Sequence, residues 1–515
     1  MRPIIPAVAA ALFATGAGAC TSTSERVVSA APAVQVTVDR DRPLTRSHEA
    51  SNLLVDRDDP SRVYLSNVEM LSGECRFHVS VDGGRTWTRG ESPALEPYTR
   101  NCVFGAAQPQ NVRTELSQAT DGTLFYAFQA NDPAAGGGRS VLLGRSADRG
   151  VSWRTSVVHG APIAVLGQEA EVNFEAHMAI DPANSRRVYA MWRRNYWNTP
   201  PGTTRPTRAW MAVSDDGGAT FAPPFMPFES EIGFDGPYPI VVGGELFAFW
   251  RERAAAVATG QPPNPTRVLV GVSGDQGRTW RQTEIARALD TSEPIPVYDR
   301  DAGRFYVVWH DNRSGDLDVY LSTSTDGATW SEARRLNDDG ERNRVGQHYP
   351  QVRLARGGRL DVAWYDWRDD PYPAPTTTNA ATPLALGSNI GKAQSVYYTS
   401  SADGGATWLP NLRINDVLID RTIGTWNNDY FVVVPVGLAA LADGAVVSWS
   451  DTRNGNADTE TQDIYASRIS FDATDDDEGI DGRLIGAGLV GAVLGAGLAL
   501  CGTVLALRSR SRAAG

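Results

Sequence analysis

Three arginines share one short motif, Trp-x-Asp-x-Arg, and their type and spacing suggest chemistry. They are Arg313, Arg368 and Arg453, each two residues after an aspartate and four after a tryptophan. A guanidinium can donate two parallel hydrogen bonds to one carboxylate, whether of the protein or of a ligand. Two alternatives follow. The motif makes structural ion pairs, repeated because the surrounding unit is repeated, or it makes a carboxylate-binding cluster.

Acidic residues recur at a second fixed place, where an apolar stretch begins. Glu49 opens EASNLLVDRDDPSRVY, and Glu175 opens EAHMAIDPANSRRVY in nearly the same words. Comparable stretches begin at Glu115, Pro237, Glu293, His348 and Asp429. If these starts and the three arginines share one face of the fold, that face carries acids alternating with arginines.

A third phrase, Ser-x-Asp-x-Gly-x-Thr-Trp, explains how such residues could be positioned. It occurs in full or shortened form six times, with its aspartate at Asp82, Asp148, Asp216, Asp275, Asp326 and Asp403. A turn aspartate accepts hydrogen bonds from backbone N–H groups just beyond it, and glycine permits a positive φ. The tryptophan offers a large apolar surface. We interpret these six aspartates as structural.

The three phrases define one repeating unit of about 60 residues. Each unit has an inner strand, a strand ending in Trp, a third strand, the Ser-x-Asp turn and a fourth strand. Four antiparallel strands of this kind form one propeller blade. We predict an all-β propeller over residues 34–470 with seven blades, or six if residues 115–160 are not a separate blade. Because the last unit lacks its fourth strand, residues 34–38 are expected to supply it and close the ring.

The two ends of the chain predict export and anchoring. Residues 1–19 resemble a secretory signal, and Cys20 follows either a lipoprotein cleavage site or an ordinary one. Residues 20–33 and 471–483 are linkers, the second acidic. Residues 484–507 carry no charge and are long enough for a transmembrane helix. The basic tail 508–515 is then cytoplasmic and the propeller lies outside the cell. In that oxidising setting, Cys75 and Cys102 are expected to form a disulfide.

Composition narrows the partners. The formal net charge is −12, which argues against nucleic acid. The chain contains no zinc, phosphate-binding or dinucleotide motif, so no metal or cofactor is predicted. The sequence does not indicate an oligomeric state.

The Ser-x-Asp phrase resembles the Asp-box of the sialidase-like β-propeller superfamily, over residues 34–470. The resemblance implies a site on the face opposite the boxes, bordered here by the long loops 195–207, 251–265 and 369–393. Sialidases hold a sugar carboxylate with three arginines, here Arg313, Arg368 and Arg453. They use a tyrosine nucleophile activated by a glutamate, and an aspartate as general acid and base. The corresponding predictions are Tyr430, then Tyr349, for the nucleophile; Glu175 or Glu293 for its base; and Asp366 or Asp311 for the acid.

One departure from that family divides the functional hypotheses. The family begins its first inner strand with Arg-Ile-Pro, whereas residues 47–51 read SHEAS. The first hypothesis is an exo-glycosidase that removes terminal sialic-acid-like sugars from glycans. The second is a non-catalytic extracellular propeller that binds glycan or protein.

Overall fold

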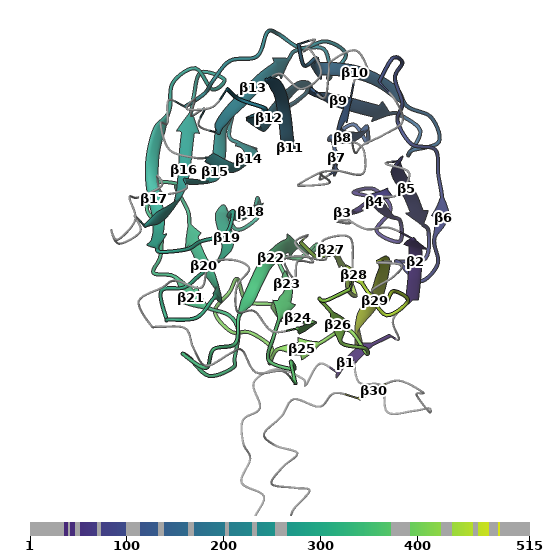
Figure 1. Ribbon diagram of the computed structural model, residues 1–515, viewed down its shortest axis with the longest axis vertical. Coiled ribbons are helices and arrows are strands. Elements are labelled where there is room, and N and C mark those ends of the chain that lie inside the picture. Colours follow the sequence, from purple (N-terminus) through teal and green to yellow (C-terminus); the bar gives the residue numbers. More distant parts are fainter. Residues whose placement is uncertain are drawn as a thin grey trace, which may run out of the picture.

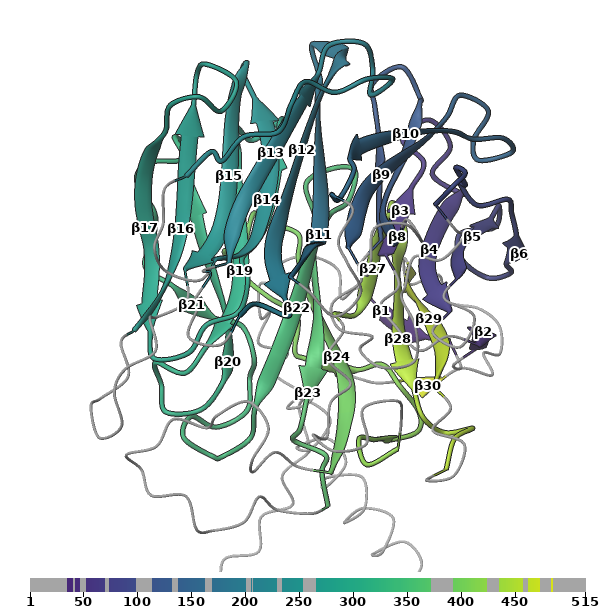
Figure 2. The same ribbon diagram turned by 45° about the horizontal axis from the view of Figure 1, so that its top comes forward.

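The computed structural model describes residues 35–39, 42–46, 52–69, 74–98, 114–131, 138–162, 169–200, 205, 207–228, 234–252, 265–371, 392–423, 435–456, 462–472 and 483–484. Within these ranges the chain is all-β, with no helix. The sheets stand side by side around a central opening (Figure 1). A tilted view shows the strands running along that opening (Figure 2). This radial arrangement is a β-propeller.

Four of the sheets are meanders, in which each strand pairs antiparallel with the next. The first comprises β3 (Asn52–Val55), β4 (Val63–Glu69), β5 (Glu74–Ser80) and β6 (Thr88–Arg89). Another comprises β14 (Phe234–Val242), β15 (Glu245–Glu252), β16 (Thr266–Ser273) and β17 (Arg281–Ala288). The next comprises β18 (Ile295–Asp299), β19 (Arg304–Asp311), β20 (Asp318–Ser324) and β21 (Arg334–Arg335). The last comprises β22 (Gln347–Leu354), β23 (Leu360–Asp366), β24 (Ala393–Ser401) and β25 (Leu412–Arg413), with β26 (Ile419–Asp420) also paired to β24.

A fifth sheet contains two repeat units joined edge to edge. One unit is β7 (Glu115–Gln118), β8 (Leu124–Asn131), β9 (Arg139–Ser146) and β10 (Arg154–His159). The other is β11 (Ala170–Asp181), β12 (Asn184–Trp197) and β13 (Arg208–Ser214). A parallel bridge between Val172 and Arg139 connects them. The second unit has an isolated bridge, Met211 to Phe225, where a fourth strand was expected, because Pro223 and Pro224 have no N–H to donate to a ladder.

The sixth sheet joins the two ends of the repeat region. It contains β27 (Gly437–Leu441), β28 (Gly444–Asp451) and β29 (Asp463–Asp472). The predicted closing strand is present as β1 (Gln35–Val38), which pairs antiparallel with β29. Two further strands, β2 (Arg42–Arg46) and β30 (Arg483–Leu484), pair with β29 and β1 respectively.

That pairing alters the start of the predicted transmembrane segment. Leu484, its expected first residue, ends β30 and lies opposite Thr37 in the sheet. Residues 485–507 lie outside the described residues. In the described part of the chain, no helix is long and apolar enough to cross a bilayer.

The apolar core lies between neighbouring units rather than within one. Among the described residues, seven apolar clusters each combine side chains of two adjacent units. In five units a tryptophan of the second strand is almost fully buried: Trp192, Trp250, Trp309, Trp364 and Trp449. Each packs against the preceding unit, so these rings bind one unit to the next.

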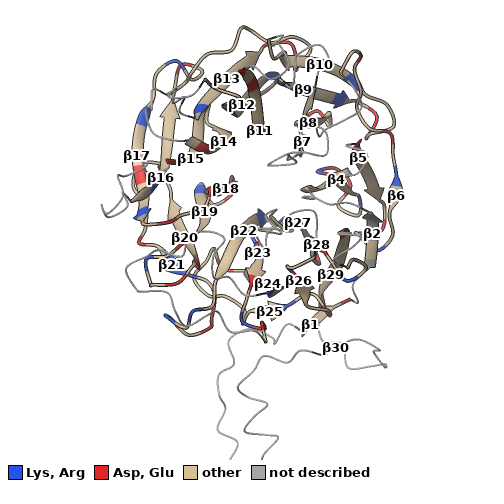
Figure 3. Cartoon of the chain, in the orientation of Figure 1, with Lys and Arg blue, Asp and Glu red and all other residues tan. Residues whose placement is uncertain are grey.

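Strand direction separates the two kinds of repeated motif. In the unit β18–β21, Phe305 pairs with Ser324 at the Asp-box end, and Asp311 pairs with Asp318 at the other end. The boxes and the Trp-x-Asp-x-Arg motifs therefore lie at opposite ends of the strands. We call the end that carries the starts of β7, β11, β14, β18 and β22 the mouth face. Acidic and basic residues both occur along the strands that border the opening (Figure 3).

Candidate functional site

In each Trp-x-Asp-x-Arg motif the arginine pairs with the aspartate of the same motif. Arg313 donates from Nη2 to Asp311 Oδ2 at 2.6 Å and from Nε to both carboxylate oxygens at 2.9 Å. Trp309 Nε1 donates to the same carboxylate at 2.7 Å. The guanidinium also lies over the ring of Tyr320, 4.6 Å from its centroid. Asp311 thus accepts hydrogen bonds from both the tryptophan and the arginine of its own motif.

The other two motifs repeat this arrangement. Arg368 donates to Asp366 at 2.8 Å and stacks 4.2 Å over Tyr397. Arg453 donates to Asp451 at 2.7 Å and stacks 4.1 Å over Tyr465. This geometry is the structural alternative drawn from the sequence. It gives no support to a substrate-binding role for the three arginines.

Asp366 shares that structural position. Its side chain is fully buried, and it accepts hydrogen bonds from Trp364 Nε1 and Arg368. Burial raises the pKa of its carboxyl, and the arginine opposes that shift. A general acid must reach the reacting bond, so the geometry does not favour the catalytic role predicted for Asp366. Asp311, the alternative acid, is fully buried in the same way.

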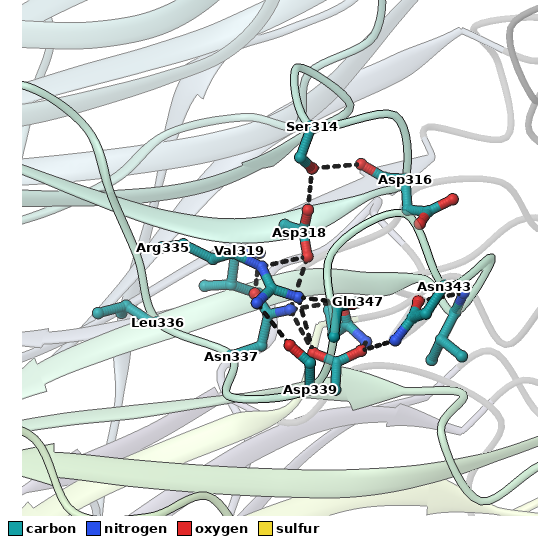
Figure 4. Close-up of polar contacts among 12 residues, drawn as sticks. Ser314, Asp316, Asp318, Val319, Arg335, Leu336, Asn337, Asp339, Asn343 and Gln347 are labelled. Carbon is teal, nitrogen blue, oxygen red and sulfur yellow. Dashed lines mark hydrogen bonds and ion pairs between the residues drawn. The ribbon is translucent and has the colours of Figure 1, made fainter. Parts of the chain in front are cut away.

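A polar network fixes the start of β22. Gln347 accepts from Asn337 Nδ2 at 2.8 Å and donates to Asp339 at 3.0 Å and Asp366 at 3.3 Å. Arg335 bridges Asp318 at 2.6 Å and Asp339 at 3.0 Å. Figure 4 shows Arg335, Asn337 and Gln347 converging on Asp339. This network therefore fixes the backbone position from which His348 and Tyr349, the next two residues of β22, extend.

Three inner strands carry a β-bulge at the mouth face. The register shifts between Phe174 and His177 in β11, between Asp235 and Tyr238 in β14, and between His348 and Gln351 in β22. One residue in each bulge has a positive φ: Glu175 at 50°, Gly236 at 61° and Tyr349 at 53°. Bulges re-aim side chains, and left-handed backbone at a non-glycine residue concentrates at functional sites. The two non-glycine residues, Glu175 and Tyr349, were both predicted from the sequence as site residues.

Charged side chains connect these bulges across adjacent units. Arg193, in the second half of β12, pairs with Glu175 at 3.4 Å and with Asp235 of β14. Arg251, at the end of β15, also pairs with Asp235. All four side chains are at least nine-tenths buried. Carboxylates raise the pKa of both arginines, against the effect of burial, so both remain cations.

The chain of contacts continues to Tyr349. Glu293 lies within electrostatic range of both Arg193 and Arg251. His310, at the end of β19, is close to Arg251 and Glu293, and its Nδ1 accepts a hydrogen bond from the Tyr349 backbone N–H at 3.0 Å. Burial lowers the pKa of His310 to about 3, so this ring is neutral. We call the set Glu175, Arg193, Asp235, Arg251, Glu293, His310 and Tyr349 the mouth arc.

Sequence reasoning found only part of the arc. Arg193 and Arg251 directly follow a buried tryptophan, as His310 follows Trp309. Successive residues of a strand point to opposite faces, so the tryptophan packs on the preceding unit while its neighbour faces the next unit. That alternation was available in the sequence. The bulge at Asp235 was not, because it depends on how β14 pairs.

Several predicted residues cannot be placed. Tyr430, Glu49, Asp429 and Cys20 lie outside the described residues, as do most of the three long loops. Cys75 is disulfide-bonded, whereas its expected partner, Cys102, also lies outside them. Among the residues the structure does describe, no group of three or more His, Cys, Asp or Glu could hold a metal.

A cavity of about 260 Å³ lies behind the mouth arc. The inner strands form its walls. On those strands that carry an arc residue, the lining begins about two positions after it. Apolar groups such as Leu116, Ile240 and Ile295 form part of it. The charged and aromatic groups are Glu115, His177, Tyr238 and Arg353.

Comparison with known proteins finds similarity to solved structures and to no family model or curated protein. Similar structures include an alpha-L-arabinofuranosidase of Fusarium graminearum, with 10% identity and a TM-score of 0.44, covering 64% of this chain and 92% of that one. Hadza microbial sialidase Hz136 has 14% identity and a TM-score of 0.43, covering 78% and 74%. Trypanosoma rangeli sialidase, in complex with the inhibitor DANA, has 12% identity and a TM-score of 0.39, covering 70% and 55%. The set therefore includes sialidases, the class that the Asp-boxes resemble.

Proposed function

We propose that this protein is a glycan-acting propeller, an exo-glycosidase whose site is the mouth arc. The observation that carries the proposal is the pair of strained bulges at Glu175 and Tyr349, in the mouth arc that also contains Glu293. Glycoside hydrolysis needs two groups flanking the bond, one of which forms or stabilises the glycosyl centre while the other transfers a proton. Tyr349 would attack the anomeric carbon as the C–O bond to the leaving group breaks, and Glu293 would take the phenolic proton and deliver it to the departing oxygen. The sugar we propose is a terminal sialic-acid-like residue, as the resemblance implies.

The test is turnover of a panel of fluorogenic sialosides and neutral glycosides by the full chain. Tyr349→Phe and Glu293→Gln should each lower kcat at least about a hundred-fold. Glu284→Gln is the matched control, because Glu284 lies on outer strand β17 and pairs with Arg287. Tyr430→Phe completes the series. If it abolishes turnover while Tyr349→Phe does not, the nucleophile assigned here is wrong.

A second candidate, a non-catalytic glycan-binding propeller, has its own supporting observation. Arg193 and Arg251 are already paired with Glu175 and Asp235, so neither offers an open fork to a sugar carboxylate. Binding to a glycan array without turnover of any glycoside would favour this candidate.

We also propose that the propeller has seven blades and is displayed outside the cell. The seven inter-unit clusters support the count if β7–β10 and β11–β13 are separate blades. Anchoring through residues 485–507 predicts that the full chain stays with the membrane after carbonate washing. A chain ending at residue 484 should be released, and its retention would contradict the anchor.

A further inference from the structure

Within the part of the chain that the structure describes, the cavity behind the mouth arc contains an arginine without an ion pair. Arg353 lies near the end of β22 and lines the cavity. Its Nη1 donates to the carbonyl oxygen of Val352 at 2.8 Å. No carboxylate of the described residues forms an ion pair with it, whereas Arg193, Arg251 and Arg335 each pair with at least one. Burial lowers the pKa of Arg353, and the negative charge of Glu115 opposes that shift.

A second polar group of the same cavity wall, His177, has one ring nitrogen without a partner among the described residues. His177 Nδ1 is hydrogen-bonded to Glu115 Oε2, and the side chain is at least nine-tenths buried. Its Nε2 has no hydrogen-bond partner within the described part of the chain. Nε2 is therefore open to a hydrogen bond with a ligand hydroxyl. The ring of Tyr238 lies against it, with centroids 3.9 Å apart.

We propose that this cavity binds a small hydroxy carboxylate of sugar-acid size. The carboxylate would accept two hydrogen bonds from the Nε and Nη2 of Arg353, which a planar fork donates in parallel. A ligand hydroxyl would donate to His177 Nε2. The cavity volume suits a single sugar ring, and the apolar wall and Tyr238 would cover its carbon faces.

Electrostatics selects this class of ligand. Among the described residues, the charged or titratable groups facing the cavity are Arg353 of β22, His177 of β11, Glu115 of β7 and Tyr238 of β14. Glu115 weakens the positive field, but His177 already occupies one of its oxygens. A half-buried cation without an ion pair is incompletely compensated, so an anion that pairs with it gains affinity. A neutral sugar lacks that gain.

The test is ligand-induced stabilisation of the full chain in detergent, followed by calorimetric titration. The probes are D-glucuronate, D-glucose and inorganic phosphate. D-glucuronate should raise Tm with increasing concentration, since a ligand of the folded state stabilises it. Arg353→Met should weaken D-glucuronate binding at least about ten-fold, and Arg353→Lys, which keeps the charge without the fork, should weaken it less. Arg278→Met, an exposed change on the Asp-box side, is the control.

Three outcomes would overturn the inference. They are equal stabilisation by D-glucose, binding of phosphate in preference to D-glucuronate, and unchanged D-glucuronate affinity in a folded Arg353→Met variant. This site does not depend on turnover at the mouth arc. A protein that binds D-glucuronate through Arg353 but hydrolyses no glycoside would refute the proposed function alone. Conversely, Glu293→Gln should abolish turnover and leave this binding in place.

Discussion

Arg193 and Asp235 join two adjacent units of the ring inside the protein. The Arg193 guanidinium, from β12, donates to the carboxylate at the start of β14, and both side chains are nearly inaccessible to solvent. Asp235 also accepts from Arg251 of its own unit. One buried carboxylate is therefore shared by two buried cations at the mouth face, and one of these, Arg193, also pairs with Glu175.

Replacing Asp235 should be among the more damaging single changes. Asp235→Asn leaves two buried guanidinium groups short of a counter-charge, which typically costs about 3–5 kcal/mol of unfolding free energy. Asp215→Asn is the control. Asp215 pairs with Arg187 at the surface, where such pairs contribute about 0–1 kcal/mol. Urea unfolding of both variants measures the difference. Equal losses would show that the buried network contributes little.

The Asp-boxes should make stability depend on acidity. Hydrogen bonds from Thr279 and Ser273 lower the pKa of Asp275 to about 2. Hydrogen bonds within the other five boxes lower the pKa of their aspartates to about 2 as well. Because the folded pKa lies below the unfolded value, the contribution is complete above about pH 4 and is lost as pH falls towards 2.

The corresponding measurement is the urea midpoint between pH 5 and pH 2. Wild type should lose stability steeply over that interval, and Asp275→Asn should show a shallower slope. Asp301→Asn, a change of the same kind at an exposed turn between β18 and β19, is the control for the loss of one surface carboxylate. A slope identical in wild type and Asp275→Asn would exclude the box as the source.

The parts of this molecule differ in how far its sequence could predict them. The bonds that close a box join residues at most four apart, as from Thr279 N–H to Asp275, so they can be inferred from a short phrase. The closing strand β1 could also be inferred, because the last repeat unit of the sequence lacks its fourth strand. By contrast, the contact of Arg193 with Asp235 spans 42 residues and depends on a bulge. Arg353 became notable only when the structure showed which carboxylates the other arginines hold.

Trp364 tests how the units are held together. Its ring is fully buried, and Nε1 donates to Asp366 at 3.0 Å. Trp364→Ala should cost about 3–5 kcal/mol through the cavity it leaves. Trp364→Phe keeps most of the volume but removes the donor, so its cost should be smaller, about 1–3 kcal/mol. Denaturant unfolding of the two variants separates packing from hydrogen bonding. A larger loss for the phenylalanine variant would contradict this division.

Gln276 offers a stabilising change that leaves the mouth face untouched. It has a φ of 62° in its Asp-box, at the position where other boxes have Gly83, Gly217 or Gly404, also with positive φ. A non-glycine side chain in this conformation costs roughly 1–2 kcal/mol, partly offset by the entropy that glycine loses on folding. Gln276→Gly should therefore raise the unfolding free energy by about 0.5–1 kcal/mol.

The reverse change provides the matched control. Gly217 has a φ of 74°, and a Cβ added there would meet no atom closer than 4.0 Å, so Gly217→Gln introduces backbone strain without a clash. It should lower the unfolding free energy by a similar amount. If the double variant Gln276→Gly with Gly217→Gln regains wild-type stability, the two boxes are independent and differ only in where the strain lies. Opposite signs for the single variants are required, because a shared sign would mean that contacts of the glutamine side chain, and not the left-handed backbone, decide the outcome.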